Sequence, residues 1–261
     1  MEINLKNKTA WVFGGSKGIG RAIAIELAKA GANILLIARN KSALHKTVAE
    51  LCAKQQQEHD VLSVDMSDTN GLKSALKKYR NTHNVDIVIN NSGGPIGGAA
   101  HTAEIDEYVE AFRQHVLAAQ AVIQIALQPM KRKQFGRIIN IISTSVKQPI
   151  DGLGVSNTVR GAMANWSKTL ASEVGQFGIT VNNILPGATM TDRLNSLITI
   201  HSQKKQLPES EVVEKMQKSI PAGRFAEPEE IAYAVVFLCS EYANYINGIN
   251  VPIDGGRTRS L

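Results

Sequence analysis

The chain has 261 residues, of which 43% are hydrophobic and 20% are charged, and its formal net charge is +6 at pH 7. This composition is typical of a soluble globular protein with a sizeable core. No apolar run approaches the ~20 residues that a membrane span needs, and the first residues lack a signal-peptide pattern, so we expect a cytoplasmic protein with no membrane segment. Cys52 and Cys239 form neither a disulfide framework nor a metal-binding spacing, and we expect no metal site.

Apolar runs typical of buried strands alternate with helical patterns along the chain. Strands are expected at Thr9–Phe13, Ala32–Ile37, Val61–Val64, Ile87–Asn90, Arg137–Ile142, Thr180–Ile184 and Ile249–Val251. Helices are expected at Gly20–Ala30, Lys41–Gln57, Thr69–Tyr79, Glu104–Lys131, Val155–Val174 and Glu229–Ser240. This alternation predicts βαβ crossovers and an α/β fold whose parallel sheet is covered by helices on both faces. Because no Gly/Ser/Pro-rich linker divides the chain, we expect a single domain over residues 1–261.

A glycine-rich turn follows the first expected strand and leads directly into a helical pattern. Its glycines permit positive φ and remove Cβ atoms that would keep a pyrophosphate away from the backbone N–H groups. The helix that follows adds unsatisfied donors and a partial positive charge. We therefore expect a dinucleotide to bind this turn, which consists of Gly14, Gly15, Ser16, Lys17, Gly18, Ile19 and Gly20.

The densest basic run, Lys131-Arg132-Lys133, ends a long helical pattern. Cations suit the C-terminus of a helix, and no aromatic residues are interleaved with these. We therefore expect a solvated helix end and no nucleic-acid partner. Docking of an acidic carrier protein at this run is a weaker alternative.

The residues Thr191–Ile220 interrupt the alternation with an insertion that contains a polar run and Pro208. In open α/β sheets, ligands bind beyond the carboxyl ends of the strands. An insertion that follows Pro186-Gly187 would suit a lid over such a crevice. The alternative is a solvated excursion of the chain.

Several motifs carry a resemblance to a known family. In chain order they are Gly14–Gly20, Asp65, Asn90–Gly93, Gly136–Ser143, Val181-Asn182, Pro186-Gly187, Thr191, Gly223–Glu230 and Asp254–Gly256. Over nearly its whole length the sequence resembles short-chain dehydrogenases/reductases, in particular the 3-oxoacyl-carrier-protein-reductase-like branch. The resemblance implies a doubly wound Rossmann sheet, a nicotinamide cofactor, and a homotetramer or homodimer paired through Glu104–Lys131 and Val155–Val174.

The end of the second expected strand indicates which cofactor is bound. An acidic residue there would hold a ribose 2′-hydroxyl and repel a 2′-phosphate, but the sequence is Ala38-Arg39-Asn40. The guanidinium of Arg39 suits a phosphate, and Lys17 could approach the same group, which resembles the family's NADP(H)-preferring pattern. The alternative is that both are plain surface charges, and that Asp65 merely caps its own segment. The resemblance also places these residues at the cofactor: Asp65, Met66, Asn91, Gly93, Arg160, Pro186, Gly187, Thr189 and Thr191.

The catalytic positions of the family are altered. Ser143 stands where its serine belongs, but the tyrosine position 13 residues later is Ser156 and the lysine position is Arg160. The asparagine position of the preceding helix falls at His115. A serine is a far weaker acid than a phenol, whose pKa is ~10, and an arginine with a pKa above ~12 cannot shuttle protons. We therefore expect cofactor binding to survive better than the family's usual chemistry.

Two residues could replace the missing proton donor. His115 has a suitable reference pKa of about 6.5, and the alternative is a histidine packed and hydrogen-bonded in a helix interface. Lys147 lies four residues after Ser143 and could protonate a substrate oxygen, or be an ordinary surface lysine. A nucleophilic pair of Ser143 and His115 is disfavoured, because the sequence has no nucleophile elbow.

The sequence thus favours an NADP(H)-dependent oxidoreductase that interconverts a carbonyl and an alcohol on a small-molecule or carrier-bound substrate. Its proton-donor site is non-standard and consists of Ser143, Ser156 and Arg160, with His115 and Lys147 as further candidates. The alternative is a catalytically silent NADP(H)-binding sensor or partner subunit. The intact cofactor motifs fit both hypotheses. The expected lid favours an enzyme that turns over, whereas the loss of the tyrosine and the lysine favours a catalytically silent protein.

Overall fold

Seven strands form one sheet in the computed structural model, which describes residues 2–81 and 83–260. The strands are β1 (Thr9–Phe13), β2 (Asn33–Ala38), β3 (His59–Ser63), β4 (Ile87–Asn90), β5 (Gly136–Ile141), β6 (Ile179–Pro186) and β7 (Asn250–Ile253). They are parallel and lie in the order β3-β2-β1-β4-β5-β6-β7. The expected parallel sheet is confirmed, and β1 and β4 have the bounds that the sequence predicts.

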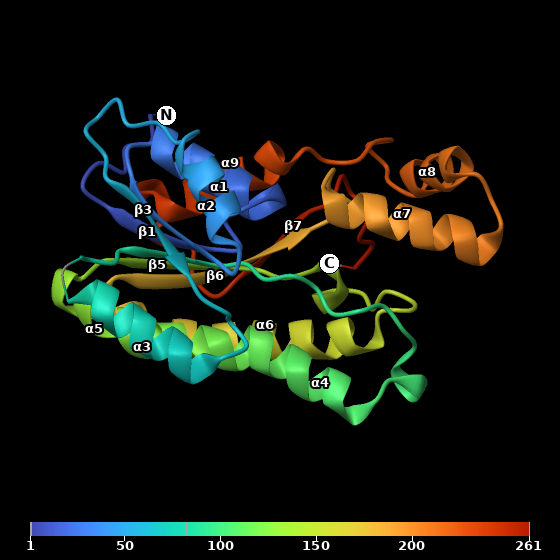
Figure 1. The fold of residues 1–261 in the computed structure, drawn as a ribbon, viewed down its shortest axis with the longest axis horizontal. Helices are drawn as coiled ribbons and strands as arrows, with labels where there is room; N and C mark the ends of the chain where they lie inside the picture. Colours follow the sequence, from blue (N-terminus) through green and yellow to red (C-terminus); the bar gives the residue numbers. More distant parts are fainter. Residues whose placement is uncertain (1, 82, 261) are drawn as a thin grey trace.

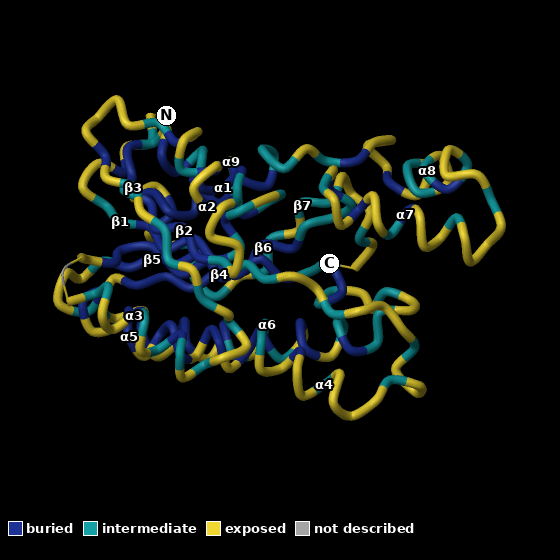
Figure 2. The backbone as a smooth tube through the Cα atoms, in the orientation of Figure 1, coloured by how far each residue is buried: buried dark blue, intermediate teal, exposed yellow. Residues whose placement is uncertain are grey.

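Helices cover both faces of this sheet. They are α1 (Gly18–Lys29), α2 (Lys41–Val48), α3 (Thr69–Arg80), α4 (Ile105–Phe112), α5 (Ala118–Lys133), α6 (Gly154–Val174), α7 (Asp192–Lys205), α8 (Glu209–Lys218) and α9 (Pro228–Cys239). Figure 1 shows α1, α2 and α9 on one face and α3 to α6 on the other. Because both faces are covered, β4 and β5 are buried along their length, which explains their continuous apolar runs (Figure 2).

The strand order reverses between β1 and β4. From β1 the chain moves outward through β2 to β3, and it then crosses back to place β4 on the other side of β1. Ligands of open α/β sheets bind at the carboxyl ends of the strands where this reversal occurs. The turn after β1 and the loop after β4 therefore border the expected crevice.

Four asparagine side chains, three of them buried, join the strands β4 to β7. Asn90 Nδ2 donates to Asn140 Oδ1 at 2.7 Å, and Asn140 Nδ2 donates to Asn183 Oδ1 at 3.0 Å and to Ser167 Oγ at 2.8 Å. Asn183 Nδ2 donates to Asn250 Oδ1 at 2.8 Å. This ladder fixes β4 to β7 relative to one another and ties them to α6 through Ser167.

Three helical segments differ from the sequence prediction. The helix expected at Lys41–Gln57 ends at Val48, since the chain turns back toward β3 and Gln57 is buried with its Nε2 donating to Ala28 O at 2.7 Å. The helix expected at Glu104–Lys131 is divided into α4 and α5 by a π-helical turn, Arg113–Leu117. The insertion at Thr191–Ile220 contains α7 and α8, whose apolar side chains share one cluster.

The basic run at 131–133 occupies the last turn of α5. Lys133 Nζ lies 2.5 Å from the buried carboxylate of Asp86, and Lys131 Nζ lies 4.2 Å from the centre of the Phe177 ring. Two of its three cations are therefore engaged within the chain. Among the described residues no helix is both long and apolar enough to cross a membrane.

Candidate functional site

The glycine turn between β1 and α1 packs closely against the loop that follows β4. Asn91 Nδ2 in that loop donates to Phe13 O at 3.3 Å and to Gly14 O at 3.4 Å. Gly14 has a φ of 61°, and a Cβ at this position would lie 2.6 Å from Asn91 Nδ2. A Cβ on Gly20 would lie 2.3 Å from Gly14 O. Glycine is therefore required at both positions, and the turn presents bare backbone at the crevice.

The N-terminus of α1 has no side-chain cap. Its N-cap residue, Lys17, makes no capping hydrogen bond, and the first turn contains no acidic residue. The helices α2, α3 and α7 are capped by the side chains of Asn40, Asp68 and Thr191, whereas α4, α6 and α8, like α1, have no side-chain cap among the described residues. The uncapped N–H groups of α1 suit the oxygens of a phosphate. The residues present therefore fit the pyrophosphate of a dinucleotide.

The two basic residues expected at a 2′-phosphate lie near this turn. Arg39 Nη1 is 3.9 Å from Asp65 Oδ2, and Lys17 Nζ is 3.4 Å from Asp192 Oδ2. The side chains of Arg39 and Lys17 are 77% and 74% exposed. Such exposed ion pairs are weak, so both cations can exchange their acidic partner for a phosphate.

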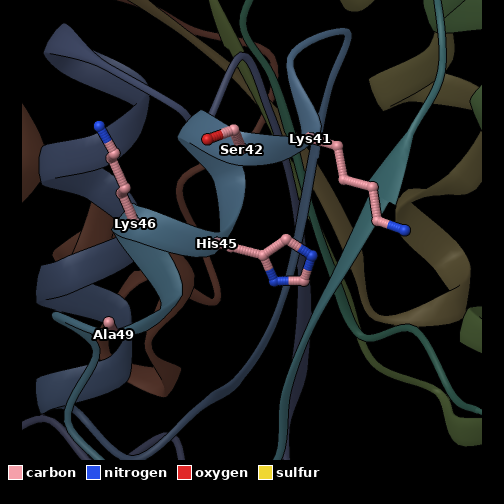
Figure 3. A pocket seen from close by; sticks show the side chains of 5 residues that line it. All are labelled: Lys41, Ser42, His45, Lys46 and Ala49. Atoms are coloured by element: carbon pink, nitrogen blue, oxygen red, sulfur yellow. The ribbon is translucent and has the colours of Figure 1, made fainter.

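The helix α2 adds a basic surface that the sequence analysis missed. Lys41, Ser42, His45, Lys46 and Ala49 line a shallow depression on this helix (Figure 3). In the figure the side chains of Lys41 and Lys46 extend to opposite sides, with His45 between them. The sequence could have indicated this basic surface, because Lys41 follows Arg39 by two positions at the start of an expected helix.

Asp65 organises its own turn beyond β3. Its Oδ1 accepts hydrogen bonds from Ser67 N at 2.9 Å and from Ser67 Oγ at 2.8 Å. These bonds hold the pKa of the Asp65 carboxyl below its ordinary value. Asp65 therefore caps its own turn, and the helix that follows, α3, is capped by Asp68. Met66 lines a small enclosed cavity together with Asn91 and Arg160.

The segment after β6 runs toward the glycine turn. Pro186 ends β6, and Gly187 N donates to Ile253 O at 2.9 Å. Thr191 Oγ1 donates to Thr189 O at 3.2 Å, and the Thr191 methyl would lie 3.2 Å from a Cβ on Gly18. This segment therefore lies directly against the turn. Gly93, on the loop after β4, is exposed.

Three of the expected catalytic residues lie around the carboxyl end of β5. Ser143 Oγ accepts a hydrogen bond from Ser145 N at 3.1 Å. Ser156 lies in the first turn of α6 and is half-buried. Lys147 is also half-buried, and its carbonyl accepts from Ser260 Oγ at 3.3 Å, so the C-terminal segment borders this side.

Arg160 is buried, with only 7% of its surface exposed. Its Nη1 donates to Ile141 O at 3.0 Å, and its Nε has no hydrogen-bond partner among the described residues. Burial, and to a lesser extent the positive charge of Arg193, lowers the pKa of Arg160 to about 10. The guanidinium therefore remains charged at pH 7.

His115 is buried within the π-helical turn between α4 and α5. Its Nδ1 lies 2.6 Å from Ser92 Oγ, so it bonds Ser92 and not Ser143. Burial, together with the nearby charge of Arg160, lowers the pKa of His115 to about 2. A neutral imidazole at pH 7 is a poor proton donor. The geometry thus favours the packed, hydrogen-bonded histidine over the proton donor.

His115 should make the fold sensitive to acid. Because its pKa is about 2 in the folded chain and near ~6.5 in the unfolded chain, only the unfolded state binds a proton between these values. Its contribution to stability is therefore complete above pH ~6.5 and is lost as the pH falls. When the pH is lowered from 7 to 5, we expect the unfolding free energy of the wild type to fall by about 2 kcal/mol more than that of His115→Asn. Urea denaturation at both pH values measures the difference. The exposed His101 provides the control variant His101→Asn. An equal pH dependence of wild type and His115→Asn would show that the ring is not held neutral.

Two further residues of the site were missed by sequence reasoning. Ser92 pairs with His115 across 23 positions, and Arg193 Nη2 on α7 donates to Pro95 O at 3.0 Å across 98 positions. No local sequence pattern predicts either contact, because both depend on how distant segments of the chain pack together.

The chain is similar to known proteins over almost its whole length. The family model described as enoyl-(acyl carrier protein) reductase matches residues 14–258. The NADPH-dependent reductase BacG of Bacillus subtilis is 30% identical over 259 residues, which cover 98% of this chain and 100% of that protein. The 3-oxoacyl-[acyl-carrier-protein] reductase FabG of Aquifex aeolicus is 29% identical over 259 residues, which cover 98% of this chain and 99% of that protein.

A solved structure extends the similarity to the fold. L-sorbose reductase from Gluconobacter frateurii, complexed with NADPH and L-sorbose, superimposes with a TM-score of 0.93 at 30% sequence identity. The match covers 100% of both chains, and so it includes the crevice and the insertion.

Proposed function

The chain belongs to the short-chain dehydrogenase/reductase family, and we propose that it is an NADP(H)-dependent oxidoreductase that interconverts a carbonyl and an alcohol. The observation that carries this proposal is the uncapped N-terminus of α1 at the glycine turn, with basic residues nearby. The relative BacG is an NADPH-dependent reductase, and L-sorbose reductase was solved with NADPH. The substrate is a small-molecule or carrier-bound carbonyl compound.

In this proposal the cofactor lies across the carboxyl ends of β1 and β4. The glycine turn holds the pyrophosphate, Lys17 and Arg39 hold the 2′-phosphate, and Asp65 and Met66 flank the adenine. The other cofactor contacts are Asn91, Gly93, Arg160, Pro186, Gly187, Thr189 and Thr191. Bound NADPH supplies the hydride.

The proton is the difficult part of the reaction. Ser143 Oγ can donate a hydrogen bond to the substrate carbonyl, but the hydroxyl of Ser156 is too weak an acid to protonate it efficiently. Arg160 retains its proton at pH 7, and His115 is neutral. The proton therefore comes from Lys147 or from water in this proposal.

The second candidate function is a catalytically silent NADP(H)-binding protein. It is favoured by the lack of a good acid at positions 115, 156 and 160. The test measures NADPH oxidation across ketones, diketones and thioester-linked 3-oxoacyl substrates, with NADPH binding measured in parallel. Turnover of any substrate supports the oxidoreductase, whereas tight binding with no turnover on the whole panel supports the silent protein.

The charge of Arg39 should select the phosphorylated cofactor. We expect Arg39→Ala to weaken NADPH binding about 10- to 100-fold, because a charge-assisted bond to the 2′-phosphate is lost, and to leave NADH binding nearly unchanged. Cofactor fluorescence titration measures both affinities.

A matched control for Arg39 lies on α2. Lys46→Ala also removes one exposed cation from this surface, and it should change NADPH affinity less than Arg39→Ala does. Equal affinities of the wild type for NADPH and NADH would contradict the assignment of the phosphate site.

We also propose that α7 and α8 form a lid. The N-cap residue of α7, Thr191, contacts the glycine turn, and Arg193 in the first turn of α7 contacts the loop after β4. Both contacts bridge segments on either side of the crevice. The Lys17–Asp192 pair adds a third, exposed contact that water can readily replace.

An exposed apolar face on α4 supports a homo-oligomer. Ile105, Val109 and Phe112 are 80%, 45% and 40% exposed, and their spacing places them on one side of the helix. Leu117 of the π-helical turn is 44% exposed. We propose that a second copy of the chain covers these four residues.

Charges placed on this face should prevent association. We expect Val109→Asp/Phe112→Asp to reduce the mass of the particle measured by light scattering, because carboxylates would be buried without partners. The control is Ile200→Asp, at a 51% exposed position on α7. A wild type that is already a monomer would refute the proposal.

A further inference from the structure

Arg193 extends from the proposed lid to the loop after β4. It is the second residue of α7, and its side chain is exposed. Its Nη2 donates to Pro95 O at 3.0 Å and would lie 3.9 Å from a Cβ on Gly94. The guanidinium is therefore held at the mouth of the crevice by one neutral carbonyl. Its other N–H donors can bind a ligand.

Arg160 lies beneath the same loop. Asn91 and Ser92, at the start of the loop, line a small enclosed cavity together with Arg160 and His115. Arg193 bonds Pro95, farther along that loop. The charge of Arg193 also contributes, less than burial does, to the lowered pKa of Arg160. The unpartnered Nε of Arg160 adds a buried donor.

Neither cation has an acidic partner among the ion pairs of the described residues. Asp192, adjacent to Arg193 on α7, is paired with Lys17 instead. Two like charges without a counter-ion, one of them desolvated, destabilise the empty crevice. An anion bound there would be attracted directly by the exposed Arg193 and also by the charge of the buried Arg160.

We propose that Arg193, with the field of Arg160 behind it, binds a carboxylate of the substrate, so that the preferred substrates are oxo acids. This inference rests on the proposed oxidoreductase function for its carbonyl. A guanidinium matches a carboxylate with two parallel hydrogen bonds and so orients the carbonyl next to it. Thioesters presented by a carrier have no carboxylate at this position and are the poorer substrates.

The test compares 2-oxo-4-phenylbutanoate with 4-phenyl-2-butanone, which lacks the carboxylate, and with S-acetoacetyl-N-acetylcysteamine, a carrier-type thioester. We expect Arg193→Gln to raise KM for the oxo acid about 10- to 100-fold, the effect of one lost charge-assisted bond. Because the Arg193–Pro95 bond also belongs to the proposed lid, a fall in kcat/KM for the neutral ketone measures the loss of that contact, and the fall for the oxo acid should exceed it about 10-fold or more. Lys204→Gln removes one exposed positive charge from the other end of α7 and should leave both substrates unaffected.

A calorimetric titration separates this inference from the proposed function. Binding of 2-oxo-4-phenylbutanoate to the NADP⁺ complex, lost in Arg193→Gln, would support the carboxylate site even if no substrate turned over. Reduction of the neutral ketone or thioester in preference to the oxo acid would overturn the site while the oxidoreductase stood. An equal loss of affinity in Lys204→Gln would also overturn it, because general electrostatics would then explain the binding.

Discussion

The double substitution Ser156→Tyr/Arg160→Lys is expected to raise the turnover of a neutral ketone with NADPH by about 10²-fold or more. A phenol placed one helical turn from an ammonium group is a far stronger acid than the serine it replaces. Both positions lie in the first two turns of α6, which contacts the segment Thr144–Val146 that follows Ser143. In our proposal Ser143 holds the substrate carbonyl. Steady-state NADPH oxidation measures the gain, and NADPH binding shows whether the crevice is intact.

A control variant of matched size separates the effect of proton donation from the effect of pocket shape. Ser156→Phe/Arg160→Lys introduces the same ring without the hydroxyl, and it should show none of the increase. If both double variants gain equally, the improvement comes from the shape of the pocket and not from proton donation. If neither gains while both bind NADPH, the crevice is not arranged for carbonyl reduction, which favours the silent protein.

The largest loss of stability is expected for Arg137→Leu. Arg137, at the second position of β5, is 1% exposed. Its guanidinium donates to Gly136 O at 2.8 Å, to Gly178 O at 3.2 Å and to Ser240 O at 3.4 Å, and it also bonds the side chain of Asn244. Burial lowers its pKa below the ordinary arginine value. The side chain therefore joins β5 to the turn before β6 and to the end of α9.

Leucine at this position would leave the buried carbonyls of Gly136 and Ser240 without the guanidinium as a donor. We expect the unfolding free energy to fall by about 3 kcal/mol or more, and Tm to fall by roughly 6–12 °C. Thermal and urea denaturation measure both quantities. Arg132→Leu, an exposed position on α5, should change stability by less than ~0.5 kcal/mol. A loss in Arg137→Leu no larger than in Arg132→Leu would contradict this role.

The secondary structure was predictable wherever local pattern is sufficient. β1 and β4 follow from short apolar runs, because a strand buried on both faces needs apolar side chains throughout. The helix expected at Lys41–Gln57 was too long, because Gln57 is fixed by a bond to Ala28 O in α1. The π-helical turn around His115 and the pair α7–α8 also depend on packing against other elements.

The sequence by itself determined the parallel α/β fold, the glycine turn and the identity of the residues at the four catalytic positions, because these depend on spacing along the chain. Tertiary structure decided the environment of those residues. Arg160 is buried and has no acidic partner in the part of the chain that the structure describes, His115 bonds Ser92, and Arg193 bonds a loop 98 positions away. The physical reason is that desolvation and charge pairing depend on neighbours in space, and the sequence order does not state which neighbours those are.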